Sequence, residues 1–210
     1  MKCDKKMMRL YAVTDRAWVG EKTLYEQVET ALEGGVTCVQ LREKELAEDL
    51  FLKEAYQLHE LCKKYKVPFI INDNVDIAVN CGADGVHVGQ KDMNIQLVRK
   101  KLAPHQMIGV SVQTVEQAIL AEKEGASYLG VGAVFTTSTK KDAISVSYET
   151  LQKICKAVRI PVVAIGGINE ENVLQLAHSG VDGIAVVSAL FAKKDIKKAA
   201  QHLYELGGQL

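Results

Sequence analysis

Three polar side chains, Gln40, Arg42 and Lys44, alternate along the run Cys-Val-Gln-Leu-Arg-Glu-Lys. Because side chains alternate faces along a strand, these three share one face, while Val39 and Leu41 share the other. Arginine offers phosphate a fixed fork of donors and lysine adds a mobile charge, so the polar face predicts a cradle for a polyanion. An edge strand with one solvated face is the alternative that this run by itself leaves open.

Two aspartates, Asp73 and Asp92, are the candidate metal ligands. Both follow short β-type runs, within Ile-Asn-Asp-Asn and His-Val-Gly-Gln-Lys-Asp. Two carboxylates without a nearby His-Cys pattern suit Mg²⁺, which binds one or two of them together with water and substrate phosphate oxygens. Each aspartate also has a local alternative, Asp73 as a turn residue and Asp92 as a cap of the helix that starts near Asn94. The two kinds of role can coexist.

Two other segments have the composition of phosphate sites. The hydroxyl-rich run at 135–142 offers hydroxyl and N–H donors and Lys140, although a solvated loop has nearly the same composition. The glycine pair at 166–167 and the run Gly-Ile-Ala-Val-Val-Ser at 183–188 can bring backbone N–H groups to an anion, with 189–191 as a short helix. A tight turn is the alternative for the glycine pair.

His87 lies inside the apolar run Gly-Val-His-Val-Gly. We expect a structural histidine, hydrogen-bonded at a strand, and not a general base. The chain has no nucleophile elbow and no P-loop. Since a convincing acid-base pair is missing, two anion sites around one cavity favour a reaction driven by leaving-group stabilisation over one driven by proton abstraction.

Short β-type runs alternate with longer amphipathic runs, for example at 24–32 and 50–64. We expect strands at 10–14, 38–42, 69–72, 85–88, 107–111, 128–134, 161–165 and 183–188. Eight strand-helix units in 210 residues predict an α/β fold, a (β/α)8 TIM barrel of one domain over 1–210. An open doubly wound sheet is the alternative. In a barrel the active site lies at the C-terminal ends of the strands, where the candidate residues fall.

Composition narrows the class of partner. The 26 basic and 26 acidic residues balance, so we expect small-molecule ligands and neither nucleic acid nor a membrane surface. Five scattered cysteines without a Cys-x-x-Cys pair predict reduced thiols in the cytoplasm. The N-terminal run has basic residues but no long apolar stretch after them, so we expect no secretion signal and no membrane span. A homo-oligomer is possible, because the sequence does not determine the oligomeric state.

Eight short motifs follow one another along nearly the whole chain. They are Tyr-Ala-Val-Thr-Asp at 11–15, Val-Gln-Leu-Arg-Glu-Lys at 39–44, Ile-Asn-Asp at 71–73, Gly-Val-His-Val-Gly-Gln-Lys-Asp at 85–92, Gly-Val-Ser at 109–111, Thr-x-Thr-Lys-Lys-Asp at 137–142, Ile-Gly-Gly-Ile at 165–168 and Val-Val-Ser at 186–188. In this order they closely resemble the thiamine phosphate synthase family.

The resemblance implies a (β/α)8 transferase that joins hydroxymethylpyrimidine diphosphate to hydroxyethylthiazole phosphate, or its carboxylated precursor, and releases diphosphate. It implies Mg²⁺ held by Asp73 and Asp92. The residues that would bind the pyrimidine diphosphate are Gln40, Arg42, Lys44, Asn72, Ser111 and Lys140, of which Arg42, Lys44, Ser111 and Lys140 would be catalytic. The residues that would contact the thiazole phosphate are Thr137, Ser138, Thr139, Gly167, Val187 and Ser188.

One departure from the family pattern concerns two prolines. The family usually has Gly-Pro, and then Phe/Tyr-Pro-Thr, where this chain has Gly132-Ala133 and Phe135-Thr136-Thr137. Loss of the prolines frees the loop backbone but removes no proposed ligand.

Two other functions fit parts of the same pattern. A related thiazole tautomerase shares the barrel and the phosphate-binding half, but moves a proton and needs no metal. A non-catalytic sensor of phosphate ligands would keep the rim and lose turnover. A requirement for Mg²⁺ is expected only of the synthase.

Overall fold

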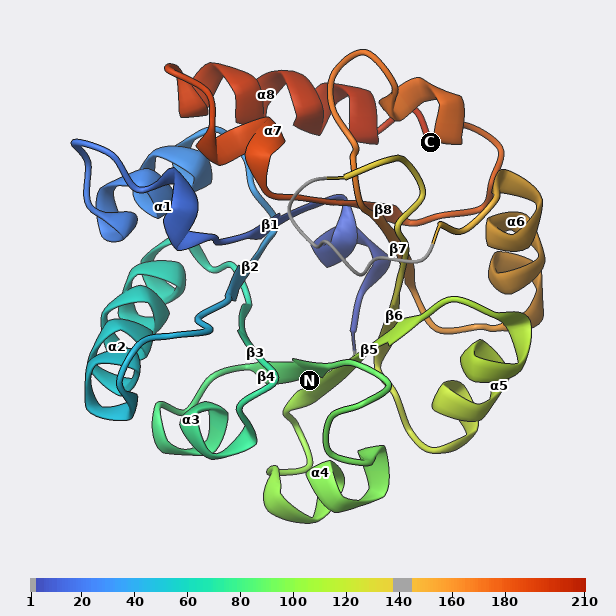
Figure 1. Cartoon of the computed structure of the whole chain (residues 1–210), viewed down its shortest axis with the longest axis horizontal. Coiled ribbons are helices and arrows are strands. Elements are labelled where there is room, and N and C mark those ends of the chain that lie inside the picture. The colour runs from blue at the N-terminus through green and yellow to red at the C-terminus, as the bar shows by residue number, and fades with distance from the viewer. Residues whose placement is uncertain (1–2, 138–144) are drawn as a thin grey trace.

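Within residues 3–137 and 145–210, which the computed structural model describes, eight parallel strands pair in chain order and the last pairs with the first (Figure 1). The strands are β1 (Leu10–Val13), β2 (Cys38–Leu41), β3 (Phe69–Asn72), β4 (Gly85–Val88), β5 (Met107–Val112), β6 (Tyr128–Val131), β7 (Val162–Ile165) and β8 (Gly183–Val186). The sheet therefore closes, which confirms the predicted (β/α)8 barrel and excludes the open doubly wound sheet.

A ring of helices covers the outside of the strands (Figure 1). The α-helices are α1 (Leu24–Glu33), α2 (Glu48–Tyr65), α3 (Val75–Asn80), α4 (Ile95–Lys101), α5 (Val115–Lys123), α6 (Tyr148–Ala157), α7 (Ser188–Phe191) and α8 (Ile196–Gly207). Three 3-10 helices accompany them, η1 (Lys5–Met8), η2 (Arg16–Trp18) and η3 (Val173–Leu176). Several helices begin at a side-chain cap, as at Thr23, where Thr23 and Glu26 form a capping box that satisfies two N–H groups of the first turn.

The alternation along each strand separates two cores. Val39 and Leu41 belong to the large cluster between strands and helices, whereas Cys38 belongs to a smaller cluster inside the barrel with Tyr11 and Tyr128. Burial of apolar area in both layers drives closure, because neither face of a parallel sheet can stay in water. The predicted facing of β2 is confirmed: Gln40 is buried next to the interior tyrosine Tyr11.

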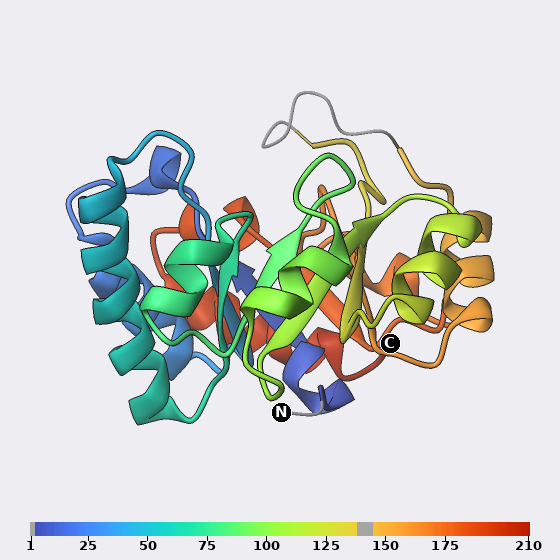
Figure 2. The ribbon, with the colours of Figure 1, turned by 90° about the horizontal axis from the view of Figure 1, so that it is seen from below.

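The two ends of the barrel differ. Figure 2 shows η1 beneath the strands, at the end opposite to the loop between β4 and α4. Met8 of η1 is fully buried in the interior cluster and closes that end. The other end, where the strands finish, is left to the loops that lead into the helices. None of the helices in the described parts of the chain is long and apolar enough to cross a membrane.

Several strand ends differ from the sequence prediction. β6 stops at Val131 and not at 134, because the N–H groups of Val134 and Phe135 donate to Ile165 O and Gly166 O, both at 3.0 Å, which carries the chain across the end of β7. β1 and β2 each end one residue earlier than predicted and β5 ends one residue later. β7 begins at Val162, since Pro161 has no N–H to give to a ladder.

The chain after β7 and β8 also corrects the prediction. Ser188 does not end a strand: β8 stops at Val186 and Ser188 is the first residue of α7. The short helix predicted at 189–191 is therefore present and starts one residue earlier. Between β7 and η3, residues 169–172 form a turn.

Candidate active site

Arg42 is held at the mouth of the barrel by the end of β1. Its guanidinium Nη1 donates to Asp15 Oδ2 at 3.0 Å, and its backbone N–H donates to Thr14 Oγ1 at 3.0 Å. Thr14 N in turn donates to Gln40 O at 2.9 Å, so the parallel pairing of β1 and β2 continues past the strand ends. The arginine is half-buried, and within the described parts of the chain one guanidinium N–H is engaged, which leaves the rest of its fork to an anion.

Lys44, Asp73 and Asp92 form one cluster, which we call the carboxylate cluster. Lys44 Nζ donates to Asp73 Oδ2 at 2.6 Å, and the carboxyl groups of Asp73 and Asp92 share a hydrogen bond. Burial opposes ionisation of Asp73, but the hydrogen bonds from Lys44 and Asp92 outweigh it and lower its pKa. Burial and the neighbouring Asp73 raise the pKa of Asp92, although the Gly89 N–H, 2.6 Å from Asp92 Oδ2, acts the other way.

The carboxylate cluster fits a divalent cation. Two carboxyl groups that touch repel each other when both are charged, and Lys44 compensates only one of them. Among the residues that the structure describes, no group of three or more His, Cys, Asp or Glu side chains is arranged for a metal. Asp73 and Asp92 alone suit Mg²⁺, whose remaining ligands are commonly water and substrate phosphate oxygens.

The local alternatives for the two aspartates have different outcomes. Asp92 is not the cap of α4: Asn94 is, and its side chain accepts from Gln96 N at 2.8 Å. Asp73 does occupy a turn, with a φ of 59°, directly after β3 and before Asn74, which caps α3. A turn residue that also faces the cluster combines both roles.

Ser111 and His87 lie side by side on the interior of β5 and β4. His87 Nε2 is 2.9 Å from Ser111 Oγ, and His87 Nδ1 is 3.1 Å from the hydroxyl of Tyr128. The histidine is therefore hydrogen-bonded at its strand, as predicted. Asn72 is the last residue of β3, next to Asp73, and its side chain also acts to lower the pKa of Asp73.

Backbone dominates the side of the mouth formed by β7 and β8. Gly166 and Gly167 have φ values of 100° and 68°, a region that favours glycine, and a β-carbon at Gly167 would lie 2.8 Å from Phe135 Cβ. Asn172 Nδ2 donates to Gly167 O at 2.9 Å and holds this turn. β8 is the neighbour of β7, and α7 follows it, with Val187 as the residue before the helix and the exposed Ser188 as its first residue.

The loop after β6 is described only at its base. Thr137 is half-buried, whereas Ser138, Thr139 and Lys140 lie outside the described residues. The Gly132-Ala133 peptide, at the place of one missing proline, is cis. Ala133 O accepts from Val146 N at 2.8 Å, so the two sides of the loop are tied together at its base.

The sequence analysis missed several side chains that hold the site. Tyr11, Tyr128 and Asp15 were assigned no role, and Arg16 was not considered although it donates to Glu43, between Arg42 and Lys44. Glycine inside a predicted strand could have indicated that a large neighbouring side chain needs space. Gly109 is the register partner of both His87 and Tyr128, and its missing β-carbon leaves room for their rings.

Comparisons with known proteins agree on one family. Residues 10–190 match the family described as "Thiamine monophosphate synthase". The chain is 54% identical over 197 residues to "Thiamine-phosphate synthase" of Ruminiclostridium cellulolyticum, and 48% identical over 198 residues to the protein of the same name from Clostridium acetobutylicum; each match covers 94% of both chains. A solved structure, "Thiamine phosphate pyrophosphorylase from Pyrococcus furiosus", superposes with a TM-score of 0.90 at 41% identity over 97% of both chains.

Proposed function

The chain belongs to the thiamine monophosphate synthase family and is a thiamine-phosphate synthase, a transferase that acts on small molecules. From this premise we propose how its residues carry out the reaction. The two sides of the barrel mouth divide the substrates between them. The side formed by β2 to β5 takes the pyrimidine diphosphate, and the side formed by β6 to β8 takes the thiazole phosphate.

On the first side, three side chains grip the diphosphate. Arg42 turns the rest of its fork to the phosphates, and Lys44 exchanges Asp73 for a phosphate oxygen. Lys140, which the family resemblance assigns to the same substrate, would be the third cation. Gln40, Asn72 and Ser111 bind the rest of the pyrimidine substrate. Asp73 and Asp92 would hold Mg²⁺, which when bound would supply Lewis-acid neutralisation of the diphosphate charge.

The chemistry is substitution with diphosphate as leaving group. Arg42, Lys44 and Lys140 stabilise the charge that develops as the C–O bond breaks, while the electron-rich aminopyrimidine supports a methylene cation. The thiazole nitrogen then forms the new C–N bond with its lone pair. Because that nitrogen carries no proton to remove, the site needs no general base.

On the second side, the thiazole phosphate is held mainly by backbone. Gly167 and the start of α7 at Val187 and Ser188 present N–H groups and a hydroxyl. Thr137, Ser138 and Thr139 would contribute further hydroxyl groups to the phosphate. The carboxylated precursor of the thiazole fits the same proposal.

The carboxylate cluster with Arg42 beside it is the observation that carries this proposal. A thiazole tautomerase or a phosphate sensor has no diphosphate to hold and gains nothing from the cations of Arg42 and Lys44, each paired with a carboxylate, and a further carboxyl group at Asp92. The protein is incubated with both phosphorylated substrates, with and without Mg²⁺, and thiamine phosphate is measured by mass. Product only with Mg²⁺ supports the metal role; equal product after chelation removes it.

The setting of the reaction is part of the proposal. Reduced cysteines, five in the chain, suit the cytoplasm. Assembly into a homo-oligomer is also part of the proposal, and the molar mass from light scattering on the purified protein tests it.

A further inference from the structure

A chain of hydrogen bonds crosses the inside of the barrel below the mouth. Gln40 Nε2 donates to the hydroxyl of Tyr11 at 2.8 Å, the hydroxyls of Tyr11 and Tyr128 are 2.7 Å apart, and Tyr128 reaches His87 Nδ1 at 3.1 Å. His87 Nε2 then reaches Ser111 Oγ at 2.9 Å. Five strands, β2, β1, β6, β4 and β5, thus contribute one residue each, and we call the set the interior relay.

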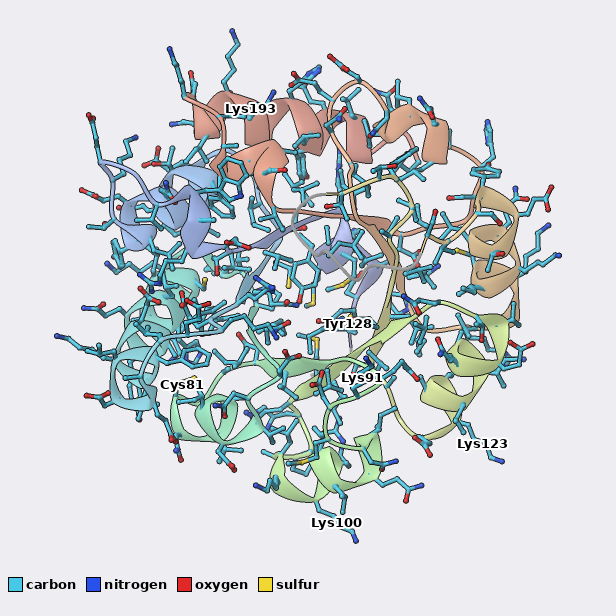
Figure 3. All side chains as sticks on the ribbon, viewed as in Figure 1. Cys81, Lys91, Lys100, Lys123, Tyr128 and Lys193 are labelled. Atoms are coloured by element: carbon cyan, nitrogen blue, oxygen red, sulfur yellow. The ribbon has the colours of Figure 1, made fainter. Side chains whose placement is uncertain are left out.

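The interior relay is built into the barrel and is not an incidental surface arrangement. Tyr11 and Tyr128 are 2% and 0% exposed, and their rings lie 5.9 Å apart at the centre of the ring of strands, where Figure 3 labels Tyr128. Desolvation raises the pKa of both hydroxyls well above the usual range, so both remain protonated and able to donate. Gly109 leaves the space, because a β-carbon there would overlap Tyr128 and His87.

The direction of the protons follows from what each group can donate. An amide nitrogen only donates, so Tyr11 must accept from Gln40. If Tyr11 donates to Tyr128 and Tyr128 to His87 Nδ1, then His87 carries its proton on Nε2 and donates to Ser111 Oγ. In the reverse order His87 would donate to Tyr128 and Tyr128 to Tyr11. The Tyr11 hydroxyl would then accept from both Gln40 and Tyr128, and its own proton would be left to the Cys38 sulfur, a weak acceptor. The first order gives the tyrosine and histidine protons nitrogen or oxygen acceptors and leaves only the Ser111 proton for a ligand.

We propose that Tyr128 is a positioning residue, which through His87 holds the Ser111 hydroxyl as a donor toward an acceptor atom of the pyrimidine substrate. The same residue acts through Tyr11 to fix the Gln40 carboxamide on the opposite side. This inference rests on the proposed contacts of Gln40 and Ser111 with that substrate. Ser111 accepts from His87 with one lone pair, so its own proton turns away from the histidine.

The decisive variant is Tyr128→Phe, which keeps the ring and removes the link. We expect the KM for the pyrimidine diphosphate to rise about tenfold or more, the size of one buried hydrogen bond to a polar partner, with the KM for the thiazole phosphate unchanged. Tyr56→Phe is the control, because the Tyr56 hydroxyl donates to Asn80 O outside the barrel at 2.7 Å and should change neither KM. An equal rise in both KM values for Tyr128→Phe would show a general loss of packing and overturn the proposal.

Two further measurements separate the relay from the site. Two-bond ¹⁵N–¹H NMR of the labelled protein reports the His87 tautomer, and the His87 signals are assigned by their loss in His87→Asn. We expect the proton on Nε2 in the parent protein and a mixture of tautomers in Tyr128→Phe. A proton on Nδ1 in the parent protein overturns the proposal. In the Ser111→Ala background, Tyr128→Phe should add little. If Ser111→Ala leaves the KM for pyrimidine diphosphate unchanged, the proposed contact of Ser111 fails; if only Tyr128→Phe has no effect, the relay fails and the contact stands.

Discussion

The two sides of the barrel mouth prepare for an anion in different ways. On the side of β2 to β4 the charges sit on side chains that are already paired, Lys44 with Asp73 at 2.6 Å and Arg42 with Asp15 at 3.0 Å. On the side of β7 and β8 the donors belong to backbone, in a turn at Gly166 and Gly167 whose φ values are positive. The first side must exchange partners when a ligand arrives, whereas the second is set by the fold.

The difference has a physical reason. A half-buried charge without a partner, such as that of Arg42 or Asp73, would destabilise the free protein, so each is paired with an oppositely charged side chain until a diphosphate replaces the carboxylates. Backbone N–H groups carry no net charge, so in the free protein they need no counter-ion. Substitutions that remove a charge on the first side should therefore affect turnover, and those on the second side affinity and stability.

The largest effect is expected for Asp73→Asn, on the charged side. Turnover should fall by at least about 100-fold, the scale of losing one group that stabilises developing charge, while the far-UV spectrum stays that of the parent. Asp76→Asn is the control, since Asp76 is exposed on α3 and pairs with Lys101. Lys140→Ala should behave like Asp73→Asn; near-normal turnover in both would remove the leaving-group account.

The next effect, on the backbone side, is expected for Gly167→Ala. The new β-carbon meets Phe135 Cβ at 2.8 Å and needs a φ of 68°, so the KM for thiazole phosphate should rise about tenfold and the unfolding free energy fall by about 1–2 kcal/mol. Gly125→Ala separates the two causes, because Gly125 also has a positive φ, 99°, but has open space around it and lies after α5. A matching rise in KM in Gly125→Ala would show that strain alone is responsible.

A smaller effect is expected for Arg42→Lys. Lysine keeps the charge but loses the fork that serves Asp15 and a phosphate at once, so the KM for the pyrimidine diphosphate should rise about tenfold, with kcat changed less. The matched change Arg99→Lys, at a residue that donates to Ala103 O and Gln106 O on the outer ring, should leave both KM values as they are. An unchanged KM in Arg42→Lys would mean that the diphosphate needs only a point charge there.

The smallest effect concerns the support behind the charged side, where Arg16 Nη2 bridges Glu43 at 2.9 Å and Glu54 at 2.7 Å. Burial raises the pKa of Glu54 despite Arg16, so the folded protein holds this proton more tightly than the unfolded chain. The unfolding free energy should therefore decrease as the pH rises from the ordinary carboxyl pKa through the raised one. Urea unfolding at several pH values should show a shallower decrease in Glu54→Gln.

Glu60→Gln, on the same helix, gives the opposite sign. A hydrogen bond and the charge of Lys63 lower the pKa of the exposed Glu60, so its contribution is present above the ordinary carboxyl pKa and is lost as the pH falls through the lowered one. If Glu54→Gln and Glu60→Gln change the pH dependence in the same direction, burial is not what sets the pKa of Glu54.

Much of the fold followed from local patterns. β3 and β4 have the predicted bounds, since the β-type runs there end at a turn residue, Asp73, and at Gly89. The errors lie where tertiary contacts decide: β6 was predicted to run to 134, but it stops at Val131, and the N–H groups of Val134 and Phe135 then bond to the end of β7 outside the regular ladder. A pattern of apolar residues cannot reveal that the carbonyl group which accepts from an N–H group lies 31 positions further along the chain, as for Val134 and Ile165.

The candidate site divides in the same way. The sequence indicated that Gln40, Arg42 and Lys44 share a face, and Gln40 is inside the barrel as that alternation requires. It did not indicate that Lys44 pairs with Asp73, because the spacing of 29 residues between them carries no geometric information until β2 and β3 are paired. Asp92 was given a possible capping role that Asn94 fills instead, since one amide side chain two residues nearer to the helix is enough to satisfy the first turn.

By itself the sequence determined the alternation of strands and helices, the polar face of β2 and the family, because these depend on the type and order of neighbouring residues. Only the tertiary structure decided which of them meet. Tyr11 and Tyr128 are 117 positions apart and share a hydrogen bond because the barrel closes and turns both side chains into one interior. Closure depends on apolar burial summed over all eight strands and their helices, which no local segment contains.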